Sequence, residues 1–204
     1  MLDALNVSRE TLERLEQFEA LVEKWNRSVN LVAKSTLPDF WTRHVVDSAQ
    51  VYFHAGEECA RWVDLGSGGG LPGVVIAILA SQFRPAQTTV LIEADKRKAA
   101  FLREAIRVTG VSAQVLAERI EDCEPCHANC LSARALAPLS GLLSYAERHM
   151  ENTGTAVFLK GGTYREEVEA ARRSWRFDLT PIESITDPAA AVLVIRNVER
   201  ASHN

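Results

Sequence analysis

The sequence predicts an α/β protein in which a mostly parallel β-sheet carries helices on both faces, behind an N-terminal helical segment. From residue 61 onward, short apolar runs typical of buried strands alternate with longer segments of helical periodicity. The first of these runs ends in a glycine-rich loop that leads into a helix. Parallel α/β sheets bind their ligands at junctions of this kind.

The first 60 residues carry helical patterns only. Residues 8–27 are expected to form an amphipathic helix with Ser8 as its N-cap, because apolar side chains recur there at spacings of three and four. A second helix is expected from Pro38 to about Phe53, with the proline in its first turn. We therefore expect a helical cap over residues 1–60 and a ligand-binding core over residues 61–204.

The core is expected to hold a run of strands with intervening helices. The expected strands are 61–65, 89–93, 113–117, 131–136 and 155–160, with a closing pair at 176–181 and 191–198. The expected helices are 74–83, 96–109, 138–150 and 164–174. Because parallel strands present their carboxyl ends at one edge, the residues that follow the first four strands should line one cleft.

Composition indicates an ordinary globular protein. The chain has 204 residues, of which 47% are hydrophobic and 25% charged. It has no apolar run long enough to span a bilayer, and residues 1–5 do not resemble the start of a signal peptide, so we expect a cytoplasmic protein with no membrane partner. The net charge of −4 counts mildly against an RNA partner, although a local basic patch suffices for RNA binding.

The loop after the first strand fits two kinds of cofactor. It reads Asp64-Leu65-Gly66-Ser67-Gly68-Gly69-Gly70-Leu71-Pro72-Gly73. Three of its glycines, spaced G-x-G-x-x-G, match the pattern that places a dinucleotide pyrophosphate on a helix N-terminus, and Glu93 follows at the matching distance. Pro72 lacks the N–H that a pyrophosphate would bind, and Asp64 suits the cationic end of S-adenosylmethionine. Glu93 can accept hydrogen bonds from the ribose of either cofactor.

The four cysteines are expected to be reduced thiols. They are Cys59, Cys123, Cys126 and Cys130. The last three, with His127, match haem-attachment and zinc-ligand spacings, but they form one cluster in an expected loop and no export signal accompanies them. We therefore expect no metal.

Several separate motifs resemble the glucose-inhibited division protein B family, the bacterial 16S ribosomal RNA guanine-N7 methyltransferases. The resemblance covers nearly the whole chain. Its motifs are Asn30-Leu31, Arg43-His44-x-x-Asp47-Ser48, the glycine loop with Leu71-Pro72-Gly73, Arg97-Lys98-x-x-Phe101-Leu102, Arg134-Ala135 and Leu159-Lys160-Gly161. It implies a class I methyltransferase fold, Rossmann-like, with a seven-stranded sheet and S-adenosylmethionine as cofactor.

The resemblance also implies roles for residues. Gly66 and Leu71 should contact the cofactor and Glu93 its ribose, with Ile120 and Glu121 beside the adenine. Arg134 should line the cleft. From the loop chemistry we add Asp64 and Gly68 to the cofactor site.

Methylation of guanine N7 needs no general base, because N7 carries a free lone pair in the ring plane. Catalysis should come from holding N7 in line with the methyl carbon. Arg134 and Lys160, each near a strand end, are the candidate catalytic residues. Asn30, His44 and Asp47 could position the base, and Arg97 and Lys98 could bind the RNA. Each also has a simpler interpretation as a local ion pair or a solvated side chain.

Two alternatives remain open at this point. One is an NAD(P)-dependent oxidoreductase, which Pro72 and Asp64 disfavour. The other is a non-catalytic RNA-binding module that keeps a relic cofactor pocket. For the leading hypothesis the expected partner is 16S ribosomal RNA or the small ribosomal subunit, bound by a monomer.

Overall fold

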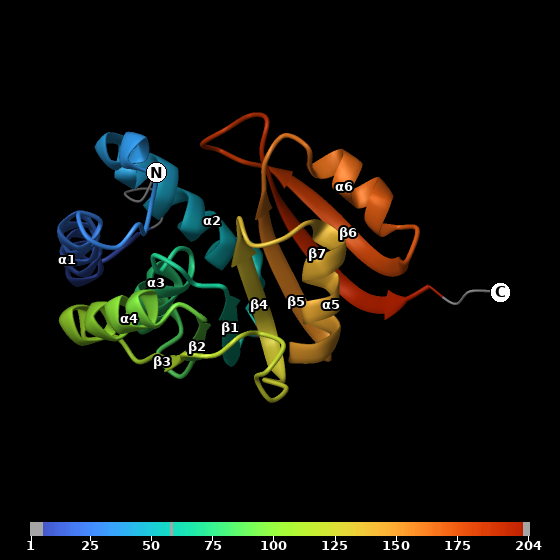
Figure 1. Ribbon diagram of the computed structural model, residues 1–204, viewed down its shortest axis with the longest axis horizontal. Helices are drawn as coiled ribbons and strands as arrows, with labels where there is room; N and C mark the ends of the chain where they lie inside the picture. Colours follow the sequence, from blue (N-terminus) through green and yellow to red (C-terminus); the bar gives the residue numbers. More distant parts are fainter. Residues whose placement is uncertain (1–5, 58, 202–204) are drawn as a thin grey trace.

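A seven-stranded sheet forms the centre of the molecule (Figure 1), with strand order β3-β2-β1-β4-β5-β7-β6. The computed structural model describes residues 6–57 and 59–201, so the expectation drawn from residues 1–5, that they do not begin a signal peptide, lies outside that part. The strands are β1 Arg61–Leu65, β2 Thr88–Ile92, β3 Gln114–Leu116, β4 Ala128–Arg134, β5 Met150–Lys160, β6 Trp175–Glu183 and β7 Ala191–Arg200. β1 to β5 pair in parallel, whereas β7 runs antiparallel between β5 and β6. The predicted mostly parallel sheet is confirmed.

Helices cover both faces of this sheet. They are α1 Arg9–Trp25, α2 Asp47–His54, α3 Gly73–Phe83, α4 Lys96–Thr109, α5 Leu139–His149 and α6 Tyr164–Ala171. Successive strand residues alternate between two hydrophobic clusters, as Trp62 and Val63 of β1 do. One cluster contains α1 to α4 and the other contains α5 and α6, so the sheet is buried on both sides (Figure 1).

Local signals fix the helix ends close to the predicted positions. The Ser8 hydroxyl accepts a hydrogen bond from the Thr11 amide, which starts α1. Asp95 accepts bonds from the Arg97 and Lys98 amides, which starts α4. That helix ends at Gly110, whose φ of 65° places it in the left-handed region.

The N-terminal helices pack into the same cluster as the first helices of the core. The buried ring of Phe18 on α1 lies 6.2 Å from the ring of Phe40 and 6.3 Å from that of Phe101 on α4. Tyr52 of α2 stacks on Trp62 of β1 at 5.8 Å. The cap is therefore docked on the sheet through aromatic contacts.

The second predicted helix is present over residues 40–54, but it is not a regular α-helix throughout. A 3-10 turn, η2 (Lys34–Asp39), contains Pro38, and a π-helical turn, η3 (Trp41–Val46), precedes α2. π-Turns carry one extra residue per turn and occur often at functional sites. The spacing of apolar residues in the sequence does not reveal a π-helical turn, because the apolar side chains around it still point to the same side of the helix.

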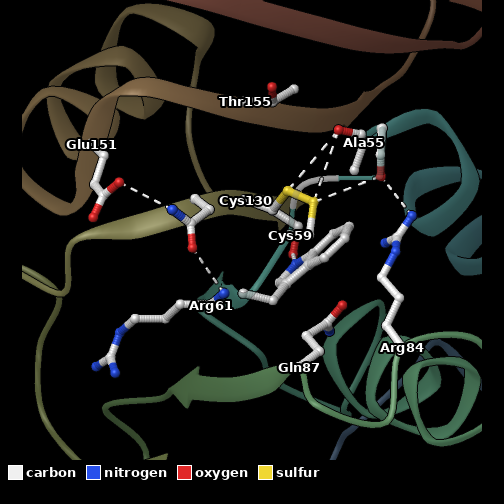
Figure 2. Close-up of a disulfide and its surroundings, with 12 residues drawn as sticks. Ala55, Cys59, Arg61, Arg84, Gln87, Cys130, Glu151 and Thr155 are labelled. Carbon is white, nitrogen blue, oxygen red and sulfur yellow. Dashed lines mark hydrogen bonds between the residues drawn. A yellow bond between two sulfur atoms is a disulfide. The ribbon is translucent and has the colours of Figure 1, made fainter.

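The expectation of four reduced thiols is wrong for two of them. Cys59 and Cys130 form a disulfide with a Cα–Cα distance of 5.4 Å (Figure 2). Cys130 lies in β4 and not in the expected loop, so it reaches Cys59, which immediately precedes β1. Cys123 and Cys126 are free and buried.

Among the described residues, no helix is long and apolar enough to cross a membrane. Within the same residues, no group of three or more His, Cys, Asp or Glu side chains is placed to hold a metal ion.

Replacing Phe18 by alanine should lower the free energy of unfolding by about 3–5 kcal/mol, because it leaves a cavity between α1 and α4. Urea denaturation measures the loss. Phe83→Ala is the control, since that ring is 37% exposed and should cost much less. Equal losses for the two variants would contradict the described packing of the cap.

The disulfide predicts a count of reactive thiols. Protein unfolded in denaturant without reductant should titrate two thiols, those of Cys123 and Cys126. Reduction before titration should raise the count to four. Cys130→Ser without reductant should titrate three, because Cys59 loses its partner. Four thiols in the unreduced protein would contradict the pairing.

Candidate active site

A cavity of about 360 Å3 opens at the carboxyl ends of β1, β2 and β4. Its volume lies within the usual range for small-molecule sites. The structure brings seven of the predicted site residues to its walls: Gly66, Gly68, Glu93, Lys98, Ile120, Glu121 and Arg134. They come from loops, from the start of α4 and from the end of β4, which are distant in sequence but meet at one sheet edge.

The glycine loop forms the floor of this cavity. Gly66 and Gly68 have φ values of 62° and 50°, which favour glycine. The Gly68 amide donates to Oε2 of Glu93 at 2.8 Å, and the Ser67 amide donates to the Ile92 carbonyl at 3.0 Å. The loop after β1 is thereby tied to the end of β2.

The N-terminus of α3, by contrast, is enclosed. A Cβ atom added to Gly69 would lie 3.0 Å from the Leu31 carbonyl oxygen, and one on Gly73 would lie 2.4 Å from Leu91. Both Gly73 and Val74 are buried. A dinucleotide pyrophosphate needs open access to these first helical amides. The enclosed helix start therefore argues against the dinucleotide alternative.

Asp64 lies beneath the loop and is fully buried. Its Oδ1 accepts a hydrogen bond from the Ser132 hydroxyl at 2.6 Å, whereas Oδ2 has no partner of hydrogen-bond geometry among the described residues. Burial raises the pKa of this carboxyl to about 6, against the lowering effect of Ser132, Ser67 and the Gly73 amide. Asp64 does not line the cavity, so here it supports the loop from below.

Glu93 is the carboxylate that does face the cavity. Its Oε1 accepts from the Asp95 amide and its Oε2 from the Gly68 amide, both at 2.8 Å. A carboxylate oxygen can accept more than one bond. The two backbone bonds therefore fix the orientation of Glu93 and leave acceptor capacity for a pair of hydroxyl groups.

Arg134 ends β4 and reaches across to the cap. Its Nη1 donates to Nδ1 of His44 at 2.9 Å and to the Arg43 carbonyl at 3.4 Å. Arginine only donates, so Nδ1 of His44 accepts and the proton of the neutral ring lies on Nε2. Nε2 then donates to the Thr36 hydroxyl at 2.8 Å. Burial, together with Arg134 and Arg43, lowers the pKa of His44 to about 4, which keeps this ring neutral.

Lys160 lies in a different environment from Arg134. Its Nζ pairs with Oε2 of Glu167 at 2.6 Å and donates to the Ala137 carbonyl at 3.0 Å. Glu167 also accepts from the Leu139 amide at 2.8 Å. Lys160 therefore holds the loop that follows Arg134, and it does not line the cavity.

The lining of the cavity also contains residues that the sequence analysis did not single out. They are Ala94, Glu118, Arg119, Leu136 and Tyr145, among others. The Tyr145 hydroxyl donates to Oε1 of Glu121 at 2.5 Å. Tyr145 lies on α5, and no motif of the sequence links that helix to the segment around Ile120.

The remaining predicted residues lie outside this cavity. His44 and Asp47 line a neighbouring hollow on the cap side. Leu71 is buried in the loop, and Asn30 and Arg97 are exposed on the surface. Lys98 was predicted to bind RNA, but it lines the cavity itself.

Comparison with known proteins agrees with this geometry. The profile of the GidB family, described as rRNA small subunit methyltransferase G, matches residues 11–191. A Ruegeria sp. protein named ribosomal RNA small subunit methyltransferase G is 50% identical over 196 residues, which are 96% of this chain and 95% of that protein. The protein of the same name from Ruegeria pomeroyi is 50% identical over 97% of both chains.

Solved structures share the fold at low sequence identity. A TehB-like SAM-dependent methyltransferase from Corynebacterium glutamicum matches with a TM-score of 0.54 at 15% identity, over 74% of this chain and 87% of that one. A mutant of MtNAS in complex with S-adenosylmethionine matches with a TM-score of 0.57 at 16% identity, over 90% and 71%.

The strand order, the single antiparallel strand and the cavity at the strand ends define a class I methyltransferase fold. Within that class, the chain belongs to the rRNA small subunit methyltransferase G family. The predicted family membership is confirmed.

The raised pKa of Asp64 predicts an unusual dependence of stability on pH. Because the folded pKa, about 6, exceeds the ordinary 3.8, the folded state binds this proton more tightly than the unfolded state does. Stability from Asp64 is then fully present below pH 3.8 and is lost as pH rises through about 6. Relative to Asp64→Asn, the wild type should lose about 3 kcal/mol across that window.

Urea denaturation of both proteins at several pH values measures this difference. Asp187→Asn is the matched control, because Asp187 is exposed and should show no comparable change. If the free energy of unfolding of the wild type changed with pH in the same way as that of Asp64→Asn, the result would contradict a buried carboxyl that titrates in this window.

Proposed function

We propose that this protein transfers a methyl group from S-adenosylmethionine to N7 of a guanine in 16S ribosomal RNA. The observation that carries the proposal is the cavity that Gly66, Gly68, Glu93 and Arg134 line, while the N-terminus of α3 is enclosed. This arrangement favours an adenosyl group over a dinucleotide. The names of its relatives indicate that the substrate is ribosomal RNA of the small subunit.

The cavity walls fit the parts of S-adenosylmethionine. When bound, this cofactor supplies an electrophilic methyl group on a sulfonium. Glu93 would accept hydrogen bonds from the ribose hydroxyls, and the segment around Ile120 and Glu121, with Tyr145, would hold the adenine. Gly66 and Gly68 would lie against the amino-acid end. Asp64 and Leu71 would act from beneath by fixing the loop.

The chain's own residues need only to bind and orient the acceptor, because N7 attacks with a lone pair that requires no deprotonation. Arg134 touches the cavity and keeps Nε and Nη2 free of hydrogen bonds among the described residues. It would bind guanine O6, which neighbours N7. Lys160 would act through the loop at Ala137 and not on the substrate.

The partner is proposed to be 16S ribosomal RNA, free or in the small subunit, bound by a monomer in the cytoplasm without a metal. Asn30 and Arg97 are exposed and able to contact RNA phosphates. The RNA would thus contact the cap at Asn30 and the core at Arg97.

Small subunits that lack the modification test the proposal. Incubation with S-adenosylmethionine should yield 7-methylguanosine in 16S ribosomal RNA, identified by nucleoside mass spectrometry. Arg134→Ala should lower kcat/KM about 10- to 100-fold, since a bond to a charged group is lost. Lys160→Met and Glu167→Gln should give smaller losses, equal to each other, because they break one ion pair.

Two controls separate the outcomes. Calorimetric titration with S-adenosylmethionine should show binding by all variants, and circular dichroism should show that they are folded. Wild-type protein that binds the cofactor but methylates no guanine would contradict the proposal and favour a non-catalytic RNA-binding module.

A further inference from the structure

A second hollow lies beside Arg134 on the side of the cap. It measures about 130 Å3, and Thr36, Arg43, His44, Asp47, Thr186 and Asp187 line it. Its residues come from η2, η3 and α2 of the cap and from the loop between β6 and β7. The hydrogen bond from Arg134 to His44 joins this hollow to the methyltransferase cavity.

The loop between β6 and β7 is clamped to the cap at this hollow. The Ile185 amide donates to Oε1 of Gln50 at 2.9 Å, and the Thr186 hydroxyl donates to Oδ1 of Asp47. Asp187 in turn accepts from the Ala189 amide through Oδ1 at 2.9 Å. The two carboxylates are thus held in place by bonds to their Oδ1 atoms, while their Oδ2 atoms make no hydrogen bond within the described residues.

The two hollows offer different hydrogen-bonding groups. Arg134 lines the methyltransferase cavity and reaches the second hollow through His44, whereas Asp47 and Asp187 line the second hollow itself. Asp47 also interacts electrostatically with both Arg134 and Asp187. The cavity side therefore offers a donor, and the hollow offers two acceptors.

We propose that this hollow binds the Watson–Crick edge of the target guanine, with Arg134 on O6, Asp47 on N1–H and Asp187 on the N2 amino group. Guanine presents O6, N1–H and N2–H2 in that order, with N7 next to O6 on the other side. A base held this way directs N7 into the methyltransferase cavity. The inference rests on the proposed function and assigns the residues that select guanine.

The same arrangement excludes adenine. Adenine places an amino group opposite Arg134 and an unprotonated ring nitrogen opposite the Asp47 carboxylate. The adenine amino group and Arg134 would then be two donors facing each other, and the ring nitrogen and the Asp47 carboxylate would be two acceptors facing each other. Sites that hydrogen-bond a polar edge reject analogues that leave those groups unpaired. The exposed Arg43 lies on the rim, where it can neutralise a nucleotide phosphate.

Asp187→Asn gives the sharpest test, because the amide keeps an oxygen for Ala189 and loses the second acceptor. With unmodified small subunits, kcat/KM should fall about 10-fold, while affinity for S-adenosylmethionine in calorimetry stays at the wild-type value. The matched control is Glu183→Gln, an exposed carboxylate on β6 outside the hollow, which should behave as wild type.

A substrate lacking the N2 amino group identifies the contact. Small subunits assembled with inosine at the target position should be about 10-fold poorer substrates for the wild type. Asp187→Asn should show a much smaller additional loss on inosine, because its partner is already missing. A merely structural role for Asp187 would give equal inosine penalties in both proteins and would overturn the proposal.

The failure of this inference differs from the failure of the proposed function. If the wild type methylates subunits but Asp187→Asn matches it on guanine and inosine, the guanine site is wrong and the proposed function stands. If the wild type transfers no methyl group to any subunit, the proposed function fails and this inference fails with it.

Discussion

The close passage of the glycine loop between the sheet and the cap is the constraint on which the rest of the structure depends. Atoms of Leu31, Asp64 and Leu91 stand where side chains on Gly69 or Gly73 would have to lie. The loop can therefore pass these atoms only because Gly69 and Gly73 have no side chain. This passage encloses the start of α3, and it leaves the space above Gly66 and Gly68 for a ligand.

Arg134 connects the two halves of the site. It ends a strand of the sheet, lines the cavity and bonds to His44 of the cap. His44 stays neutral because burial and two nearby guanidinium groups lower its pKa. A neutral ring with its proton on Nε2 offers Arg134 an acceptor, which a charged ring would not. The orientation of Arg134 thus depends on the π-helical turn that carries His44.

Carboxylates in this protein take different roles according to their burial. Asp64 is fully buried and supports the loop, whereas Glu93 is bound by two amides and faces the cavity. Asp47 and Asp187 line the second hollow, and within the described residues they accept hydrogen bonds only through their Oδ1 atoms. The sequence predicted that both Asp64 and Glu93 contact the cofactor, Asp64 at its cationic end and Glu93 at its ribose, because residue type alone does not reveal depth. Only packing decides which carboxylate reaches a ligand.

The sequence by itself determined the α/β alternation, the mostly parallel sheet, the glycine loop and the residues at the strand ends. These follow from local periodicity and from the rule that parallel strands share one carboxyl edge. The division at residue 60 remains a prediction. The tertiary structure alone decided the π-turn at His44, the Cys59–Cys130 pair, the ion pair of Lys160 with Glu167, and the approach of Asp187 to Asp47. The cysteine pair and the approach of Asp187 to Asp47 join segments far apart in sequence, and the π-helical turn changes a helix without changing its apolar pattern. Lys160 and Glu167 are close in sequence, but they meet only because the chain turns between β5 and α6.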